Sequence, residues 1–356
     1  MLLLTHGGDG VIARLSVLDR FLPLWIGLAM GAGLLLGNLV PDIDDAINAA
    51  HVDTVSLPIA VGLLAMMYPV LARVRYGDVR AETGGRRTLL VTLLFNWVAG
   101  PALMFVLAWG FLPDKSDLRT GLVVVGIAPC IAMVLIWNDL ALGNREMAAV
   151  LVAVNALIQV VAFSVYGWFY LEVLPGWLGW DTASIDVSMW TIARSVLVFL
   201  GVPLAAGWLT RRWGEKRRGR EWYEREFLPR IGPLALYGLL FTIVCLFAMQ
   251  GERITDSPLE VIQVAAPLLF YFALMWAGAF VVARRIGLKY DHCVTVAFTA
   301  AGNNFELAIA VCIAVFGATS GQALAGTIGP LIEVPVLVAL VYVALWARRF
   351  FPAGRP

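Results

Sequence analysis

The 356-residue sequence contains few charged residues, few histidines and few cysteines. Charged side chains make up 14% of it, against roughly 25% in soluble domains, so water is not its main solvent. A net charge of +1 gives no case for nucleic-acid binding. Only three lysines occur and none follows a glycine, so the sequence has no Walker A phosphate loop and no sign of ATP-driven transport.

The scarce cysteines and histidines do not form a metal-binding pattern. The cysteines stand at positions 130, 245, 293 and 312 without a C-x-x-C pair, and no histidine lies at ligand spacing from them. We therefore predict no disulfide framework, no zinc site and no cofactor. The first twenty residues lack a long apolar stretch with a small-residue cleavage site, so the first span is expected to remain as an anchor.

Hydrophobic residues make up 60% of the chain and give a mean hydropathy of +0.82. They cluster in ten blocks near the length needed to cross a bilayer. These blocks are Phe21–Val40, Leu57–Ala72, Leu89–Phe111, Gly121–Trp137, Met147–Leu171, Met189–Leu209, Leu234–Met249, Val261–Ala283, Val294–Phe316 and Ala323–Trp346. The sequence therefore predicts an all-α polytopic membrane protein with ten transmembrane helices.

The basic residues test this topology, because Lys and Arg concentrate in cytoplasmic loops. With a cytoplasmic N-terminus, all 26 fall on the inner side except Lys115, Arg119, Arg194 and Arg253. Both termini are then cytoplasmic, and the short loops favour a bacterial or archaeal cytoplasmic membrane. The most basic connection, Arg211–Arg230, could bind nucleic acid or anionic lipid, but we interpret it as a cytoplasmic loop that sets the topology.

The ten spans divide into two sets of five in the outer connection Glu172–Ser188, giving residues 1–187 and 188–356. An odd number of spans makes the two halves opposite in orientation, which is the arrangement of inverted-repeat transporters. Span three reads LLFNWVAGPALMFVLAW and span eight reads PLLFYFALMWAGAFVVA, and this weak likeness supports the repeat. Spans four and nine then occupy corresponding positions.

Those two spans contain the strongest helix-breaking signals. Pro129 in span four removes a backbone donor, and Gly302 and Asn303 in span nine favour unwound backbone. Freed backbone groups within a membrane must be buried in protein or line a wet cavity, so matching breaks predict a site near the midplane. The alternative is ordinary kinking, which is common in membrane helices.

Two of the 25 acidic residues, Glu306 and Glu333, cannot be placed in loops or at span ends. A carboxylate at this depth is costly and is by default a functional residue, often a proton or cation site. Glu333 lies in a span that Pro330 and Pro335 are expected to interrupt. The alternative is structural pairing, with Arg194 as a candidate partner.

The motifs around these residues resemble the arsenical-resistance-3 family of arsenite efflux carriers, within the bile acid/arsenite/riboflavin transporter superfamily. The resemblance covers nearly the whole chain. It implies two inverted five-helix repeats with broken spans four and nine crossing near the centre, and export of arsenite, and often antimonite, in exchange for protons. The motifs are LLFNWVAGPALMFVLAW from residue 93, GIAPCIAMVLIWNDLALG (126–143), NALIQ (155–159), TAAGNNFELAIAV (299–311) and GPLIEVPVLV (329–338).

The resemblance assigns the family's motif cysteine to Cys130 and its motif glutamate to Glu306. As(III) is the substrate that Cys130 would hold, because As(III) is thiophilic and one thiol binds it weakly enough for release. Arsenite carries no charge at physiological pH, so a proton on Glu306, shared with Glu333, is expected to supply the driving force. Further motif positions that would contact substrate or support the site are Trp137, Asn155, Asn304, Phe305 and Glu333.

The chain departs from some members of the family at the residue before the motif cysteine. Those members carry Arg there, whereas this chain has Pro129, so Arg119 and Arg194 are the candidates for a basic residue at the site. Two other functions stay open. A sodium-coupled organic-anion importer would fit the fold but gives Cys130 no role. A membrane enzyme would need a His, Ser or metal constellation that does not accompany these residues, so we predict a carrier.

Overall fold

The computed structural model describes residues 22–40, 43–49, 51–52, 55–74, 85–131, 133–180, 189–256 and 258–351. Helices occupy most of this part of the chain, and its β-structure is a hairpin of two-residue strands, β1 (His51–Val52) and β2 (Val55–Ser56). The helices of the first half are α3 (Leu22–Leu39), α4 (Ile43–Asn48), α5 (Leu57–Ala72), α6 (Arg86–Leu94), η1 (Phe95–Ala99), α7 (Gly100–Phe111), α8 (Ser116–Gly126), α9 (Val134–Leu140), α10 (Arg145–Trp168), η2 (Phe169–Val173) and α11 (Leu174–Trp177).

The second half of the described chain is also helical. Its elements are α12 (Met189–Val196), η3 (Leu197–Gly201), α13 (Val202–Arg218), α14 (Arg220–Trp222), η4 (Tyr223–Phe227), α15 (Leu228–Asp256), α16 (Pro258–Arg285), α17 (Tyr290–Ala301), α18 (Phe305–Phe316), α19 (Gly321–Ala347) and η5 (Arg348–Phe350). The predicted boundary between the repeats, at residues 187 and 188, lies outside the described residues. So does the predicted N-terminal cytoplasmic segment that precedes Phe21.

Helical turns of π type interrupt four of the long helices at places with a shared sequence cause. Each of η1 to η4 is followed by one residue and then a proline, namely Pro101, Pro175, Pro203 and Pro229. Proline has no N–H to bond the preceding turn, and its ring crowds the carbonyl four residues before it. The backbone widens by one residue there and the helix continues in the same direction.

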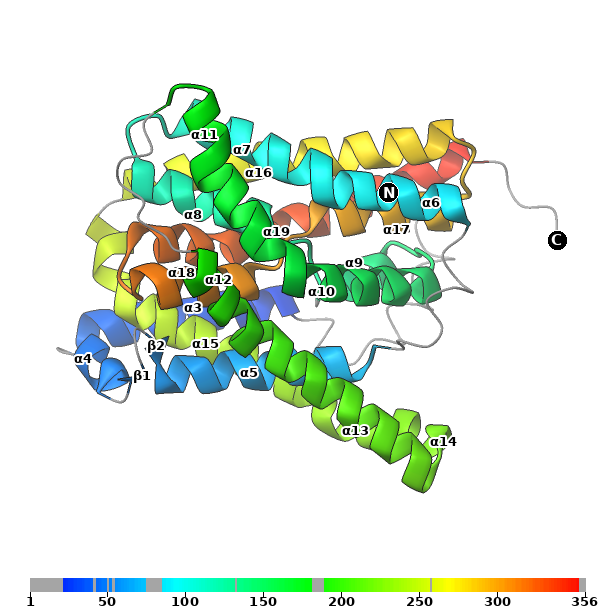
Figure 1. The fold of residues 1–356 in the computed structure, drawn as a ribbon, viewed down its shortest axis with the longest axis horizontal. Coiled ribbons are helices and arrows are strands. Elements are labelled where there is room, and N and C mark those ends of the chain that lie inside the picture. Colours follow the sequence, from blue (N-terminus) through cyan, green and yellow to red (C-terminus); the bar gives the residue numbers. More distant parts are fainter. Residues whose placement is uncertain are drawn as a thin grey trace, which may run out of the picture.

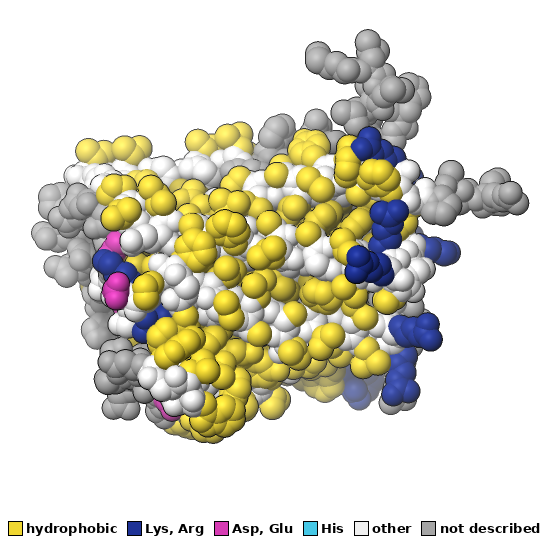
Figure 2. All heavy atoms as spheres, turned by 90° about the horizontal axis from the view of Figure 1, so that it is seen from above, with side chains coloured by type: hydrophobic (Ala, Val, Ile, Leu, Met, Phe, Trp, Pro, Cys, Tyr) yellow, Lys and Arg dark blue, Asp and Glu magenta, His cyan; other side chains and the backbone are white. Residues whose placement is uncertain are grey.

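Six helical segments are long and apolar enough to cross a membrane: Arg86–Phe111, Arg145–Trp177, Met189–Arg218, Arg220–Gly251, Pro258–Arg285 and Gly321–Phe350. Shorter apolar helices cover 24–39, 57–72 and 305–316. Apolar side chains cover the flank of the molecule, and Lys and Arg gather at one of its ends (Figure 2). A surface of this kind is stable in lipid, so the chain is a multi-pass membrane protein.

Two groups of helices make up the molecule. Helices α3, α5, α13 and α15 pack on one another and form the lower part of the view in Figure 1. Helices α7, α8, α16, α17 and α19 pack together in the other group, where α8 contacts α19 and α16 contacts α17. Helix α10 lies against α12 and also contacts α9 and α17. The interrupted helices α8/α9 and α17/α18 therefore lie within the molecule.

Two expectations about local structure were wrong. The segment Arg211–Arg230 is not a loop: helix continues on both sides of Gly219, whose φ of +87° allows a sharp turn. Ion pairs between residues four apart stabilise these helices, including Arg211–Glu215 at 2.9 Å and Arg225–Glu221 at 2.6 Å. Helix α19 also runs without interruption through Pro330 and Pro335, because membrane helices tolerate proline when neighbours satisfy the freed groups.

Candidate functional site

Two helices break at facing positions inside the molecule. Helix α8 ends at Gly126 and α9 begins at Val134, while α17 ends at Ala301 and α18 begins at Phe305. We call residues 127–131 and 302–304, which lie between these helix ends, the crossover. Four helix ends therefore meet at one place, and two of them are N-termini, which carry partial positive charge.

Backbone hydrogen bonds join the two non-helical segments of the crossover. The Cys130 N–H donates to the Gly302 carbonyl at 2.9 Å, and the Asn304 N–H donates to the Ala128 carbonyl at 2.7 Å. The residues at positions 129 and 303 lie opposite each other in an antiparallel bridge. Each broken segment thus satisfies backbone groups of the other, which lets non-helical backbone persist in an apolar interior.

Side-chain amides hold this pairing in place. The Gln159 side chain on α10 donates to the Pro129 carbonyl and accepts a 2.9 Å hydrogen bond from the Asn304 amide. The Asn304 oxygen caps α18 by accepting from the backbone N–H of Leu307 at 3.1 Å. One turn before Gln159, the Asn155 oxygen accepts from side chains of the π-helical turn η1, those of Asn96 and Trp97, both at 3.2 Å.

The thiol-bearing residue of the crossover lies close to a buried acid. Cys130 is 1% exposed. A Cβ atom added at Gly302 would come within 2.9 Å of the Cys130 Cβ and 3.5 Å of the Glu333 Oε1. The missing side chain at position 302 therefore lets the Cys130 and Glu333 side chains approach each other across the backbone of the crossover.

Two acids flank the crossover without basic partners among the described residues. Glu306 lies in the first turn of α18 and is 5% exposed, and Glu333 on α19 is fully buried. Neither forms an ion pair in the described part of the chain. Neither oxygen of Glu333 has a partner there within hydrogen-bond geometry, although the Asn303 backbone N–H lies close by. A buried acid without a partner is costly unless it binds a proton or a ligand.

The remaining residues predicted for the site divide into near and distant ones. Trp137 on α9 is buried and its Nε1 has no partner among the described residues. Phe305 is buried against Gly329 of α19, where an added Cβ would overlap the ring, so it acts in packing. Arg119 donates to carbonyls at the far end of α8, including that of Pro113 at 2.6 Å, and Arg194 is exposed on α12. The structure does not bring either arginine to the crossover.

Two crossover contacts were missed by the sequence analysis. Gln159 stands within the quoted NALIQ motif but was given no role, although its spacing of four from Asn155 places both amides on one helical face. Tyr271 on α16 donates to the Asn303 Oδ1 at 3.0 Å, and the Asn303 Nδ2 has no partner in the described part of the molecule. A lone buried tyrosine inside an apolar span was the available signal.

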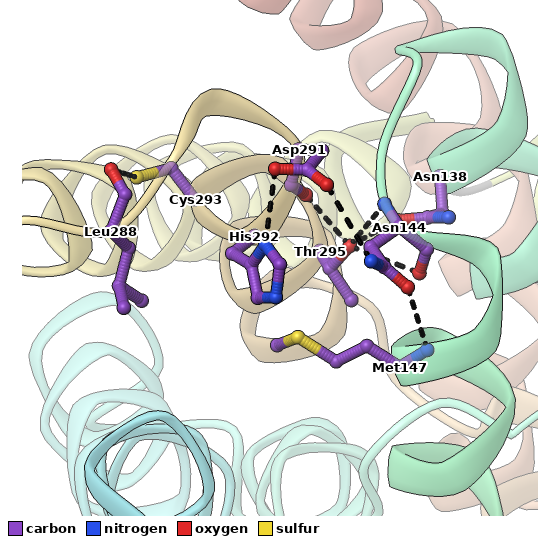
Figure 3. Close-up of polar contacts among 8 residues, drawn as sticks. All are labelled: Asn138, Asn144, Met147, Leu288, Asp291, His292, Cys293 and Thr295. Atoms are coloured by element: carbon purple, nitrogen blue, oxygen red, sulfur yellow. Dashed lines mark hydrogen bonds and ion pairs between the residues drawn. The ribbon is translucent and has the colours of Figure 1, made fainter. Parts of the chain in front are cut away.

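A second polar cluster lies at the other end of α17 (Figure 3). The Thr295 hydroxyl donates to the Asn138 Oδ1 at 2.7 Å and accepts from the backbone N–H of Asn144 at 2.9 Å. The Asn144 Nδ2 lies 3.5 Å from the Asp291 Oδ2, whose other oxygen contacts His292 Nδ1 at 3.0 Å. We call these five residues the Asn144 cluster. It joins the turn between α9 and α10 to the beginning of α17.

The crossover and the residues next to it present the Cys130 thiol, side-chain amide groups and the carboxyl groups of Glu306 and Glu333. Within the described residues, His, Cys, Asp and Glu side chains do not gather in groups of three or more that could hold a metal ion. The arrangement therefore suits a ligand that binds one thiol reversibly and forms hydrogen bonds with the amides. The two carboxyl groups beside it are candidate proton-binding groups.

Comparison with known proteins identifies similar chains. Residues 60–257 match the model of the sodium bile acid symporter family. The chain is 55% identical to the arsenical-resistance protein Acr3 of Corynebacterium glutamicum over 96% of its own length and 92% of that protein. It is 30% identical to the arsenical-resistance protein Acr3 of Alkaliphilus metalliredigens, over 98% and 96% of the two chains, and 33% identical to an uncharacterized transporter of Synechocystis, over 95% and 91%.

Proposed function

Because the chain belongs to the arsenical-resistance-3 family, within the bile acid/arsenite/riboflavin transporter superfamily, we propose that it exports arsenite from the cytoplasm in exchange for protons. Antimonite, the heavier congener whose Sb(III) centre is also thiophilic, is the candidate second substrate. The observation that carries this proposal is the position of Cys130 within the crossover, backbone-paired to Gly302 and near Glu333.

Cys130 supplies the soft ligand in this mechanism. Its thiol replaces one hydroxyl group of arsenous acid, forming an As–S bond and releasing water, and the reverse reaction releases the substrate. We expect the amides of Asn304 and Asn155 and the indole of Trp137 to donate to the remaining hydroxyl groups, since the Asn155 Nδ2 and the Trp137 Nε1 have no partner among the described residues. Binding through one thiol is reversible, as a carrier requires. Phe305 supports the site by fixing α18 against α19.

Glu306 and Glu333 couple this exchange to protons. Both carboxyl groups are buried at a depth where a charge is costly, which is the usual setting of proton sites in membrane carriers. Protonation from outside favours release of substrate, and the protonated carrier returns to the cytoplasmic side and loses the proton there. The missing hydrogen-bond partners of Glu333 in the described residues support this role, because a static structural acid would be paired.

We also propose ten spans arranged as inverted repeats, residues 1–187 and 188–356, with both termini in the cytoplasm of a cell whose cytoplasmic membrane holds the carrier. In such a repeat, a contact between two helices should recur between their counterparts in the other half. Helices α8 and α17 begin the corresponding spans four and nine, and α10 and α19 form spans five and ten; α8 packs on α19, and α17 packs on α10. Likewise α3 and α13 belong to spans one and six, and α5 and α15 to spans two and seven; α3 packs on α15, and α13 packs on α5. The gathering of Lys and Arg at one end of the molecule (Figure 2) supports the cytoplasmic assignment of that end.

Everted membrane vesicles test the proposal directly. Arsenite should accumulate in vesicles whose lumen is acidic, and a protonophore should abolish the accumulation. Arsenite uptake that ignores the proton gradient would refute exchange with protons. Cys130→Ser should lower the rate by at least about tenfold, equivalent to losing about 1.4 kcal/mol of interaction. Cys245→Ser, at a buried cysteine on α15, is the matched control and should transport normally.

A sodium-coupled organic-anion symporter is the second candidate, favoured by the family model that matches residues 60–257. A carboxylate beside unpaired backbone and amide groups can also bind Na⁺. In that case sodium would drive uptake of an organic anion into right-side-out vesicles, and Cys130→Ser would leave the uptake unchanged. Arsenite accumulation without sodium would exclude this function.

A further inference from the structure

A groove lies between α16 and α19 at the end of the molecule where basic residues gather. Its volume is about 460 Å³. Aromatic side chains form most of its wall and two arginines stand at its mouth: the residues used below are Trp276, Phe280, Trp346, Phe350, Arg284 and Arg285. The mechanism of arsenite exchange uses none of them.

The apolar wall of this groove is open to its surroundings. Trp346 is 55% exposed and Phe350 is 45% exposed, whereas Trp276 and Phe280 are buried at the base. The exposed side of a membrane helix meets lipid chains, so the groove is filled by hydrocarbon when the protein lies in a bilayer. Trp276 and Trp346 therefore border the path of an acyl chain.

The charges at the mouth have no anionic partner in the described part of the chain. Arg284 donates to the Phe350 carbonyl at 3.2 Å, which holds its guanidinium at the groove. Arg285 forms no ion pair or hydrogen bond with a described residue. Arg349 lies over Trp346 at 4.0 Å from the ring centre and Arg348 over Tyr290 at 5.9 Å. Four cations thus gather within two short segments, and none of them forms an ion pair with a described acid.

We propose that this groove is a binding site for a phospholipid with an anionic headgroup. The phosphate group lies between Arg284 and Arg285, and one acyl chain lies along Trp276 and Trp346. Basic pockets between membrane helices at the cytoplasmic face bind such headgroups, while a zwitterionic lipid would place its own cation against the arginines. The proposal concerns a lipid and is independent of what the carrier transports.

Tryptophan quenching by brominated lipids provides the test, since Trp276 and Trp346 line the groove. The full-length protein is reconstituted into phosphatidylcholine vesicles that contain increasing fractions of bromine-labelled phosphatidylglycerol or, separately, bromine-labelled phosphatidylcholine. We expect a saturable component of quenching with an affinity about tenfold higher for the anionic lipid. The double variant Trp276→Phe/Trp346→Phe should lose this component and keep the unsaturable quenching of the other tryptophans.

Charge variants decide whether the arginines cause the preference. Arg284→Gln/Arg285→Gln should reduce the tenfold preference to about equal affinity. The single variant Arg285→Gln provides a milder change, because Arg285 holds no described contact that folding would lose. Arg225→Gln is the control, since Arg225 is exposed and pairs with Glu221 in another part of the molecule.

Three results would overturn the proposal. Equal quenching by the two lipids would show a nonselective lipid layer. A preference that survives both arginine variants would place the anionic site elsewhere. Displacement of the labelled lipid by millimolar inorganic phosphate would show that the groove binds a free anion rather than a lipid.

Discussion

The two ends of helix α17 carry polar clusters that differ in how completely they are satisfied. In the Asn144 cluster, Thr295 and Asn144 exchange hydrogen bonds with their neighbours, and the Asn138 Nδ2 is the exception without a described partner. At the crossover, both oxygens of Glu333 and the Nδ2 of Asn303 lack partners among the described residues. The twelve-residue helix α17 thus carries a closed network in its first half and adjoins an open one at its end.

This difference indicates different functions. A buried hydrogen bond that is made contributes about 1 kcal/mol of stability, whereas a buried polar atom left without a partner costs about 1 to 3 kcal/mol. A cluster that satisfies itself can be explained by stability alone. A cluster in which a buried carboxyl group lacks hydrogen-bond partners needs another explanation, and binding of a proton or a substrate provides it.

The largest effect is expected for Glu333→Gln. The amide keeps the shape of the side chain but cannot exchange a proton, so proton-driven arsenite uptake should fall by at least about tenfold. Thermal stability in detergent should stay within about 1 kcal/mol of the wild type, because no described hydrogen bond to the carboxyl group is lost. Uptake in everted vesicles and the unfolding midpoint measure the two effects.

Glu333→Gln therefore separates the two explanations of an open carboxyl group. If the variant unfolds readily, Glu333 stabilises the fold and the contrast between the clusters disappears. Glu306→Gln is the companion variant on α18. It should lose proton dependence of transport while arsenite still protects Cys130 from alkylation, since the thiol is intact.

The next effect concerns the close approach across the crossover. In Gly302→Ala, the new methyl group would come within 2.9 Å of the Cys130 Cβ, so the paired segments must move apart. Overpacking of this kind costs about 1 to 3 kcal/mol, and we expect arsenite transport to fall about tenfold. Gly110→Ala on α7 is the control, because an added Cβ there meets no atom within 4 Å. Normal transport by Gly302→Ala would show that the crossover adapts freely.

The helices, the membrane location and the place of the crossover could be predicted from the sequence, because a lipid environment restricts which residues can occur within a span. The apolar blocks predicted helices, and Pro129 with Gly302 and Asn303 drew attention to the segments that the structure shows as non-helical. The all-helical class and the membrane location followed from composition. The role of Cys130 as a ligand for As(III) was predicted from the family resemblance and not from its position in a span.

The errors and omissions have physical causes. Proline was expected to interrupt α19, but a proline in a membrane helix breaks it only when neighbours offer the freed groups no alternative. A high density of charge is typical of loops and so predicts a loop at Arg211–Arg230, although Arg and Glu four residues apart favour helix. The contact between Gln159 and the Pro129 carbonyl could not be predicted, because one amide in an apolar helix does not indicate which distant carbonyl it contacts.

Thr295→Val tests the closed cluster and should affect stability more than transport. Valine keeps the size of threonine but loses its hydroxyl group, which serves both Asn138 and the Asn144 N–H. We expect a loss of about 1 kcal/mol in the free energy of unfolding, moderated because the Asn144 N–H also donates to the Asp291 carbonyl at 3.2 Å. Arsenite transport at a temperature well below the unfolding midpoint should change less than twofold, roughly the size of a 0.4 kcal/mol effect. A loss of transport equal to that of Glu333→Gln would mean that both clusters belong to the transport site.

The smallest effect is a pH dependence at Asp291, which precedes the apolar block that begins at Val294. Burial alone would raise the pKa of this carboxyl group, but the hydrogen bonds and charge of His292 and the hydrogen bond from Asn144 outweigh burial and hold the pKa below 3.8. A lowered pKa in the folded protein means that ionised Asp291 contributes stability at neutral pH, and that the contribution is lost as the pH falls below 3.8. The group is partly exposed, so this contribution should stay well under about 1 kcal/mol. Unfolding midpoints of the wild type and Asp291→Asn should therefore differ at pH 5 and converge only in stronger acid, and midpoints that already coincide at pH 5 would show that Asp291 is not stabilised in its charged form.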